Sequence, residues 1–210
     1  MNFKDNENMI PDKAESERRK NSIAGSFQSI IHNLVRYEKD YYGDSIERTP
    51  ERVAKMYWEE MFKGLNPDNY PKVTVQDNTF EYKNMVLECG IEINSCCEHH
   101  FVPILGKAHI AYIPSDKVLG LSKLNRIADY FARRPQVQER LTLEIAQDLN
   151  KYFKDVAVCI DAIHCCVKMR GIQDSNCVTR TYELTGNFKK SNTLRGEFFN
   201  HIPNLKDFKI

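Results

Sequence analysis

Two clusters of cysteine and histidine residues give this chain its clearest chemical signal. The first is Cys97-Glu98-His99-His100 and the second is His164-Cys165-Cys166. Cysteine thiolates and histidine imidazoles are the usual protein ligands of zinc. Three such ligands, for example Cys97, His100 and Cys166, would hold a metal and leave one tetrahedral position open. An open position distinguishes a catalytic zinc from a structural one.

The spacing inside the first cluster is that of half a metal site. Two residues separate Cys97 from His100, so both side chains can converge on one ion. The adjacent His99 then stays unbound and can act as an acid or base near neutral pH. Cys96 is a competing ligand by residue type, but we expect its thiol to point away from the site.

The second cluster lies in a predicted strand from Val156 to Lys168. Successive side chains of a strand alternate between its two faces, so His164, Cys166 and Lys168 share one face. Arg170 joins them if the chain stays extended. This face would present a metal ligand, a second proton carrier in His164, and two cations. Three other cysteines have a simpler interpretation as small hydrophobic residues: Cys89, Cys159 and Cys165.

A hydroxyl and two cations gather at the start of a predicted helix whose apolar stripe runs from Leu121 to Phe131. They belong to Ser122, Lys123 and Arg126. Such groups near a helix start suit a polyphosphate, and an ordinary solvated helix face is the alternative. The chain has no G-x-x-x-x-G-K-[ST] loop, so it does not hold a nucleotide in the manner of a P-loop protein.

Gln138 and Glu139 lie at the start of a long helix that Pro135 is expected to open. Glutamate in a first helical turn often serves only to complement the helix dipole. A carboxylate can also accept both adjacent N–H donors of a guanine edge. Adenine lacks that donor pair, so a well-placed Glu139 would select guanine.

Hydrophobic periodicity divides the chain into three parts. Residues 1–21 are mostly charged or polar and predict a disordered arm. Residues 22–84 carry two helical patterns and a loop-rich linker, while residues 85–210 combine extended and helical patterns. Helices followed by a sheet with two inserted helices predict an α+β fold, with the catalytic domain in residues 85–210.

Composition excludes several classes of partner. The 210 residues include 30 basic and 29 acidic side chains, so the net charge of +1 gives no reason to expect nucleic acid or an anionic membrane. No segment has the apolar length of a secretory signal or a membrane span. The seven cysteines are odd in number and clustered, which favours reduced thiols and a cytoplasmic protein.

Four segments together resemble the motifs of the GTP cyclohydrolase I family, in the family's order. The segments are residues 97–103 (CEHHFVP), 120–127 (GLSKLNRI), 134–141 (RPQVQERL) and 164–171 (HCCVKMRG). The likeness covers roughly residues 22 to 200 and leaves the charged N-terminal arm outside. Four separate motifs in one order are hard to obtain by chance.

The resemblance implies a role for each matched residue. Cys97, His100 and Cys166 match the zinc ligands, and His99 and His164 match the catalytic histidines. The substrate contacts divide into a guanine pocket, formed by Gln138, Glu139 and backbone near Leu121 and Val137, and a triphosphate site, formed by Ser122, Lys123, Arg126 and Arg170.

The resemblance also implies a fold, an assembly and a reaction. The fold is the tunnelling fold, an antiparallel sheet with two inserted helices, whose sheets join into a barrel across subunits. The assembly is a homodecamer of two stacked pentamers with active sites between subunits. The reaction is hydrolytic opening of the imidazole ring of GTP, which releases formate and gives 7,8-dihydroneopterin triphosphate, the first step of tetrahydrofolate and pterin biosynthesis.

Three other classes of protein compete with this interpretation. Another tunnelling-fold enzyme, acting on a pterin or deazapurine, is disfavoured by the zinc residues and the second histidine. A zinc nucleobase deaminase needs H-x-E with P-C-x-x-C, and the chain has no C-x-x-C. A structural zinc module would want a fourth protein ligand and no spare histidines.

Overall fold

The computed structural model describes residues 13–35 and 43–208. The chain divides into two compact units, Met1–Asn69 and Tyr70–Ile210. In the first unit, Phe27 of α1 contacts Tyr57 edge to face, with ring centroids 5.5 Å apart. The helical elements of this unit are α1 (Lys13–Leu34), α3 (Thr49–Lys55), the π-helical turn η3 (Met56–Met61) and the short 3-10 turns Gly43–Ile46, Lys63–Leu65 and Pro67–Asn69.

Helix α1 begins nine residues before the helix predicted from residue 22, since Lys13 is its first residue. The charged residues of this stretch were assigned to the disordered arm, but their spacing supports a helix. Arg19 pairs with Glu15 at 2.6 Å, and Lys20 pairs with Glu17 at 2.6 Å. Pairs three or four residues apart stabilise a helix because they lie on one face. Residues 1–12 of the predicted arm lie outside the described residues.

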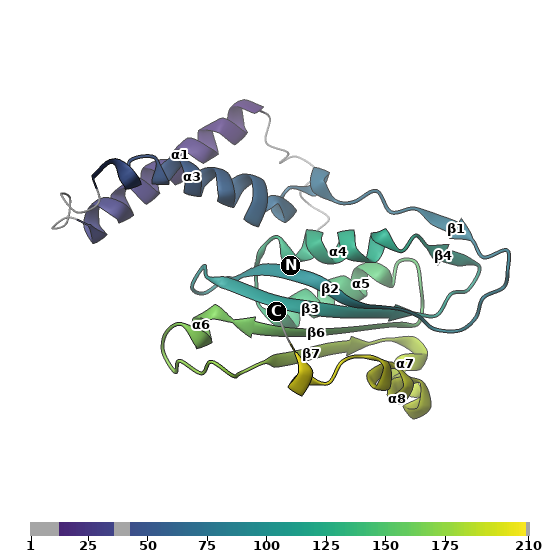
Figure 1. Ribbon diagram of the computed structural model, residues 1–210. Coiled ribbons are helices and arrows are strands. Elements are labelled where there is room, and N and C mark those ends of the chain that lie inside the picture. Colours follow the sequence, from purple (N-terminus) through teal and green to yellow (C-terminus); the bar gives the residue numbers. More distant parts are fainter. Residues whose placement is uncertain (1–12, 36–42, 209–210) are drawn as a thin grey trace. The chain divides into compact units, whose positions relative to one another are not determined.

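A five-stranded sheet forms the centre of the second unit, in the order β5-β2-β3-β6-β7. Neighbouring strands run antiparallel except β5, which pairs with β2 in parallel. A separate antiparallel pair, β1 with β4, lies beyond one end of the sheet (Figure 1). The strands are β1 (Val75–Asp77), β2 (Val86–Cys97), β3 (Pro103–Tyr112), β4 (Lys117–Leu119), β5 (Pro135–Gln136), β6 (Val156–His164) and β7 (Thr179–Leu184).

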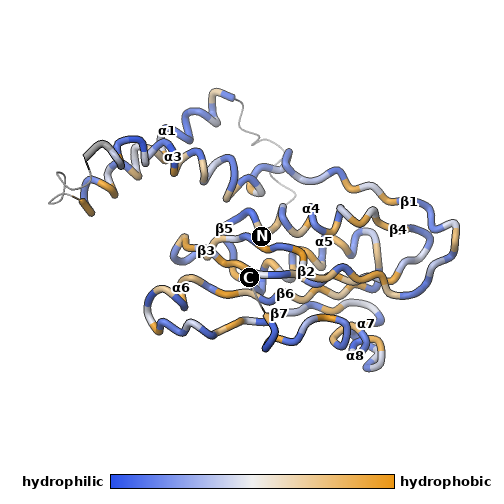
Figure 2. The backbone as a smooth tube through the Cα atoms, in the orientation of Figure 1, coloured by the Kyte–Doolittle hydropathy of each residue, from blue (hydrophilic) through white to orange (hydrophobic). Residues whose placement is uncertain are grey.

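Helices cover both faces of the sheet. On β6, Val158 and Ile160 belong to the core cluster that includes residues of α4 (Ser122–Ala132) and α5 (Gln138–Leu149). Ala157 and Cys159 of the same strand face the opposite way, into a smaller cluster with α7 (Gly186–Lys190) and α8 (Asn192–His201). Hydrophobic residues concentrate along the central strands (Figure 2) because β3 and β6 are covered on both faces.

The α+β architecture is confirmed, with both inserted helices and a largely antiparallel sheet. The sequence analysis did not predict the short strands β1, β4 and β5 or the C-terminal helices α7 and α8. In the described parts of the chain, no helix combines the length and apolar character needed to cross a membrane.

Two predicted boundaries near the cysteine clusters are wrong. Strand β6 ends at His164, and Cys165–Lys168 form the helical turn α6, so the predicted alternation of faces does not extend to Cys166, Lys168 or Arg170. The strand ends there because Ile104↔His164 is its last pair with β3. Pro135 does not open the long helix either. It lies in β5, and α5 begins at Gln138.

Gly106 marks the tightest approach between β3 and β6. A Cβ atom at this position would clash with the backbone oxygen of Asp161 and lie 2.7 Å from Cβ of Ala162. We expect Gly106→Ala to lower the free energy of unfolding by about 2 kcal/mol, since an overpacked core must shift. Gly196→Ala in α8 is the control, because a Cβ there meets nothing within 4 Å. Equal urea midpoints for the two variants would contradict this prediction.

Candidate metal centre and active site

The turn between β2 and β3 is closed by backbone hydrogen bonds that place two donor side chains together. Cys97 N donates to Val102 O at 2.8 Å, and Phe101 N donates to Cys97 O at 2.8 Å. Phe101 adopts a left-handed conformation with φ of 53°, which turns the chain back into β3. In this closed turn Sγ of Cys97 lies 3.8 Å from Nδ1 of His100.

The third donor reaches the same place from the end of β6. The register pairs Ile104, next to the turn, with His164, so α6 starts beside the turn (Figure 1). The ligating atoms of Cys97, His100 and Cys166 all lie within 4.8 Å of one another. Tetrahedral zinc with ordinary bond lengths would separate a sulfur and a nitrogen ligand by about 3.6 Å. The spacing and chemistry of these donors therefore fit a zinc-like metal.

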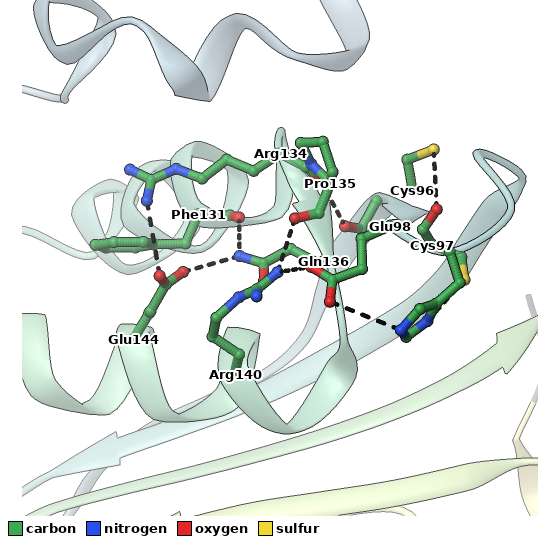
Figure 3. Close-up of polar contacts among 11 residues, drawn as sticks. Cys96, Cys97, Glu98, Phe131, Arg134, Pro135, Gln136, Arg140 and Glu144 are labelled. Carbon is green, nitrogen blue, oxygen red and sulfur yellow. Dashed lines mark hydrogen bonds and ion pairs between the residues drawn. The ribbon is translucent and has the colours of Figure 1, made fainter. Parts of the chain in front are cut away.

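The thiols around this centre differ in their surroundings. Burial, and then contact with Cys97, raises the pKa of the Cys166 thiol. A bound metal would oppose this shift, because a coordinated thiol is deprotonated. Cys96 is fully buried, and burial raises the pKa of its thiol to about 11. Its Sγ lies 3.9 Å from the Cys97 carbonyl (Figure 3), and it is not among the three clustered donors.

The two remaining histidines lie in different environments. The His99 side chain is 63% exposed, and its Nε2 lies 3.8 Å from Oε1 of Glu98. His164 is half-buried, with Nε2 2.7 Å from Oε1 of Gln138. Burial lowers the pKa of His164, which favours its neutral form at neutral pH. The described cluster of metal donors includes neither histidine, although Nδ1 of His99 lies 4.0 Å from Sγ of Cys97.

A network of polar side chains ties the metal-binding turn to α5 (Figure 3). Arg140 donates through Nη2 to Oε2 of Glu98, in the turn, and to the Pro135 carbonyl at 2.9 Å. The backbone N–H of Glu98 donates to the carbonyl of Gln136 at 3.0 Å. Both the side chain and the backbone of Glu98 are thereby fixed next to Cys97.

The network continues through the buried side chain of Gln136 (Figure 3). Its Oε1 accepts from Nε of Arg140 at 2.9 Å, while its Nε2 donates to the Phe131 carbonyl at 3.0 Å and to Glu144 Oε2 at 2.8 Å. Arg134 lies 3.8 Å from the other oxygen of Glu144. The sequence gives little sign of this network, because Gln136 lies in the two-residue strand β5, and only Arg140 and Glu144 share a face of α5.

The predicted guanine-pocket and triphosphate residues do not all lie near the metal-binding turn. Glu139 is exposed at the start of α5, and its charge acts on His164. Arg170 is exposed just beyond α6, and its charge acts on Cys166. Val137 immediately precedes α5, as Leu121 precedes α4. These placements gather Glu139 and Arg170 around the metal-binding end of the sheet.

Ser122 and Lys123 lie in the first turn of α4, and Arg126 lies near the middle of the helix. The last turn of α4 adjoins β5, since the Phe131 carbonyl accepts from Gln136. Ser122 begins the helix, so it lies roughly 14 Å farther along the axis, at the rise of an α-helix. Figure 1 shows β4, which leads directly into α4, at the end of the sheet away from α6. One chain therefore keeps Ser122 and Lys123 apart from its own metal centre.

Three donors that could hold a metal, with two further histidines nearby on an α+β scaffold, are typical of metal-dependent enzymes. A structural zinc site would require a fourth protein donor, and the described cluster contains three. Comparison with known proteins narrows this class.

The family model of GTP cyclohydrolase I matches residues 25–203. GTP cyclohydrolase 1 of Flavobacterium johnsoniae is 47% identical over 195 residues, which cover 92% of this chain and 84% of that protein. GTP cyclohydrolase 1 of Salmonella arizonae is 48% identical over 193 residues, with 91% and 86% coverage. The crystal structure of apo archaeosine synthase QueF-Like superposes with a TM-score of 0.39 and 15% identity, covering 50% of this chain and 94% of that one. The chain belongs to the GTP cyclohydrolase I family.

Removal of one donor tests the composition of the metal centre. We expect Cys166→Ala to abolish stoichiometric zinc binding, because two donors and water do not replace a thiolate at this position. Cys165→Ala is the matched control, since its thiol lies outside the described donor cluster. Zinc content after dialysis, measured by atomic absorption, gives the result. A Cys166→Ala protein with full zinc content would show that the ligand assignment is wrong.

Removal of Arg140 tests whether the network positions the metal-binding turn. We expect Arg140→Met to weaken zinc binding by about tenfold or more, as loss of outer partners of a metal site typically does. Arg133→Met is the control, because Arg133 pairs with Asp129 one turn earlier on α4. Competition with a chromogenic chelator measures the affinity. The same zinc affinity in both variants would argue against a positioning role for Arg140.

Proposed function

We propose that this protein is a zinc-dependent GTP cyclohydrolase I. It opens the imidazole ring of GTP by hydrolysis, releases formate and forms 7,8-dihydroneopterin triphosphate, the entry step to tetrahydrofolate and pterins. The observation that carries the proposal is the convergence of Cys97, His100 and Cys166, with His99 and His164 outside that cluster. Membership of the family supports the choice of GTP as substrate.

Zinc is the metal that best suits two thiolates and one imidazole with a fourth position open. When bound in such a site, zinc supplies a hydroxide nucleophile near neutral pH. All seven thiols of the chain are free, which fits a reducing cytoplasm.

Side chains of the protein recognise the guanine base and transfer protons. The carboxylate of Glu139 accepts the two N–H donors of the guanine edge and so orients the base toward the metal centre. His164 protonates nitrogen 7 of the imidazole ring, which makes the ring a better electrophile. His99 is exposed at the turn and serves as the second proton carrier.

The triphosphate is held by a basic surface built from Ser122, Lys123, Arg126 and Arg170. The separation of the α4 cluster from the metal centre of the same chain supports a site completed by a neighbouring copy. We therefore propose an active site between subunits, in a homodecamer of two pentamers whose sheets join into a tunnelling-fold barrel. Val137 contributes a backbone group to the guanine pocket from the chain that supplies Glu139, and Leu121 contributes one from the neighbouring copy.

GTP turnover tests the proposed function. We expect metal-replete protein to release formate and a product that becomes a fluorescent pterin on oxidation, and a chelator should abolish both. Glu139→Ala should lose GTP binding, measured by calorimetry, while it keeps full zinc content, because the carboxylate contacts the base and not the metal.

Glu197→Ala is the control for Glu139→Ala, because it removes an exposed carboxylate from α8. It should bind and convert GTP as the unmodified protein does. Absence of formate and pterin from GTP with fully zinc-loaded protein would refute the proposed function. Unchanged GTP affinity in Glu139→Ala would refute the role of that residue.

A further inference from the structure

The side chain of Gln138 occupies a buried position where α5 begins, and its amide has only one allowed orientation. The residue is 1% exposed. Its Nε2 donates to the Ile160 carbonyl of β6 at 2.9 Å and to the Thr179 carbonyl of β7 at 3.0 Å. An amide nitrogen has two hydrogens, and these two carbonyls use both. A flipped amide would place Oε1 against two carbonyl oxygens in a buried site, which costs free energy.

The fixed amide determines where His164 carries its proton. Oε1 of Gln138 lies 2.7 Å from Nε2 of His164, and an amide oxygen can only accept a hydrogen bond. Nε2 of His164 must therefore be the donor. Neutral imidazole has one N–H, so its other nitrogen, Nδ1, has a free lone pair.

We propose that Gln138 is a positioning residue that holds His164 as the Nε2–H tautomer, so that His164 exchanges protons only through Nδ1. This inference deepens the proposed function, on which the catalytic role of His164 rests. In the charged form both nitrogens carry hydrogen, and the proton given to the guanine ring leaves from Nδ1. The Nε2–H stays in its bond to Gln138 throughout, so the ring keeps one orientation in both protonation states.

The family resemblance gives Gln138 a place in the guanine pocket, and this inference gives it a role at His164. The side chain is 1% exposed, and carbonyls of β6 and β7 already use both of its amide hydrogens. Its neighbour Glu139 is exposed and remains the residue suited to the guanine edge. The two neighbouring residues thus have separate roles. Glu139 contacts the substrate, and Gln138 positions His164.

A second link holds the start of α5 to β7 without touching His164. Oγ1 of Thr142 donates to the Gln138 carbonyl at 2.9 Å and lies 2.6 Å from Oγ1 of Thr181. Loss of the Thr142 hydroxyl removes packing and hydrogen bonding in the same region. A Thr142→Val variant therefore separates a general structural effect from an effect on His164.

Nitrogen NMR of the zinc-loaded protein tests the tautomer directly. Protein labelled with ¹⁵N in its histidine rings is measured by magic-angle spinning in slightly alkaline buffer, and a His164→Asn sample identifies the signals of His164. We expect Nε2 to carry the hydrogen and Nδ1 to have the chemical shift of an unprotonated nitrogen. A hydrogen on Nδ1 of neutral His164 would overturn the proposal. This measurement needs no GTP turnover, so its result is independent of the proposed function.

Kinetics of Gln138→Met provide the second measurement. Methionine keeps the length of the side chain but cannot accept from His164, so we expect kcat for formate release to fall by about 100-fold with KM for GTP nearly unchanged. Zinc content should stay complete. Thr142→Val should keep the kcat of the unmodified protein. Wild-type kcat in Gln138→Met, or equal losses of kcat in both variants, would contradict the positioning role.

Discussion

The parallel pairing of two residues of β5 with the end of β2 is the constraint on which the site depends. Pro135 and Gln136 lie beside Cys96 and Cys97, so the start of α5 is fixed next to the metal-binding turn. The pairing is short, but the Gln136 side chain reinforces it with bonds to Phe131, Glu144 and Arg140. A buried amide with all these partners is costly to displace, because each freed group would lose its hydrogen bond without gaining water.

The order of the strands explains how distant cysteines meet. β3 lies between β2 and β6, and its first residues pair with Cys96 on one side and His164 on the other. The turn that carries Cys97 and His100 therefore adjoins the chain that leaves β6 toward Cys166. A helical turn at that exit directs Cys166 to the cluster, and His164 remains in the sheet, where Gln138 reaches it.

The sequence predicted the chemistry of the site better than its local geometry. Cysteine and histidine spacing indicated a metal centre, and strand and helix periodicity gave the main elements of residues 85–184. Alternation failed beyond His164, because it holds only while a strand has a partner, and β3 offers none past Ile104. A strand of two residues, such as β5, is too short to show hydrophobic alternation. Neither its pairing with β2 nor the role of Gln136 could therefore be predicted. The position of Ser122 relative to the metal depends on tertiary structure in the same way.

Under the proposed function, two parts of one chain have different roles. One part carries out catalysis at the metal centre, and the other binds the triphosphate of GTP. Proton transfer and metal binding gather at the β2–β3 turn, where donors need partly buried, fixed surroundings. The α4 cations lie farther along that helix, where Arg126 is exposed and Lys123 is partly exposed, so water solvates them when no substrate is bound. A triphosphate extends well beyond the base, and in the proposed assembly it meets the α4 cations of a neighbouring copy. Because the residues for both tasks are present, association of copies is the direct way to bring a metal centre and a phosphate surface to the same substrate.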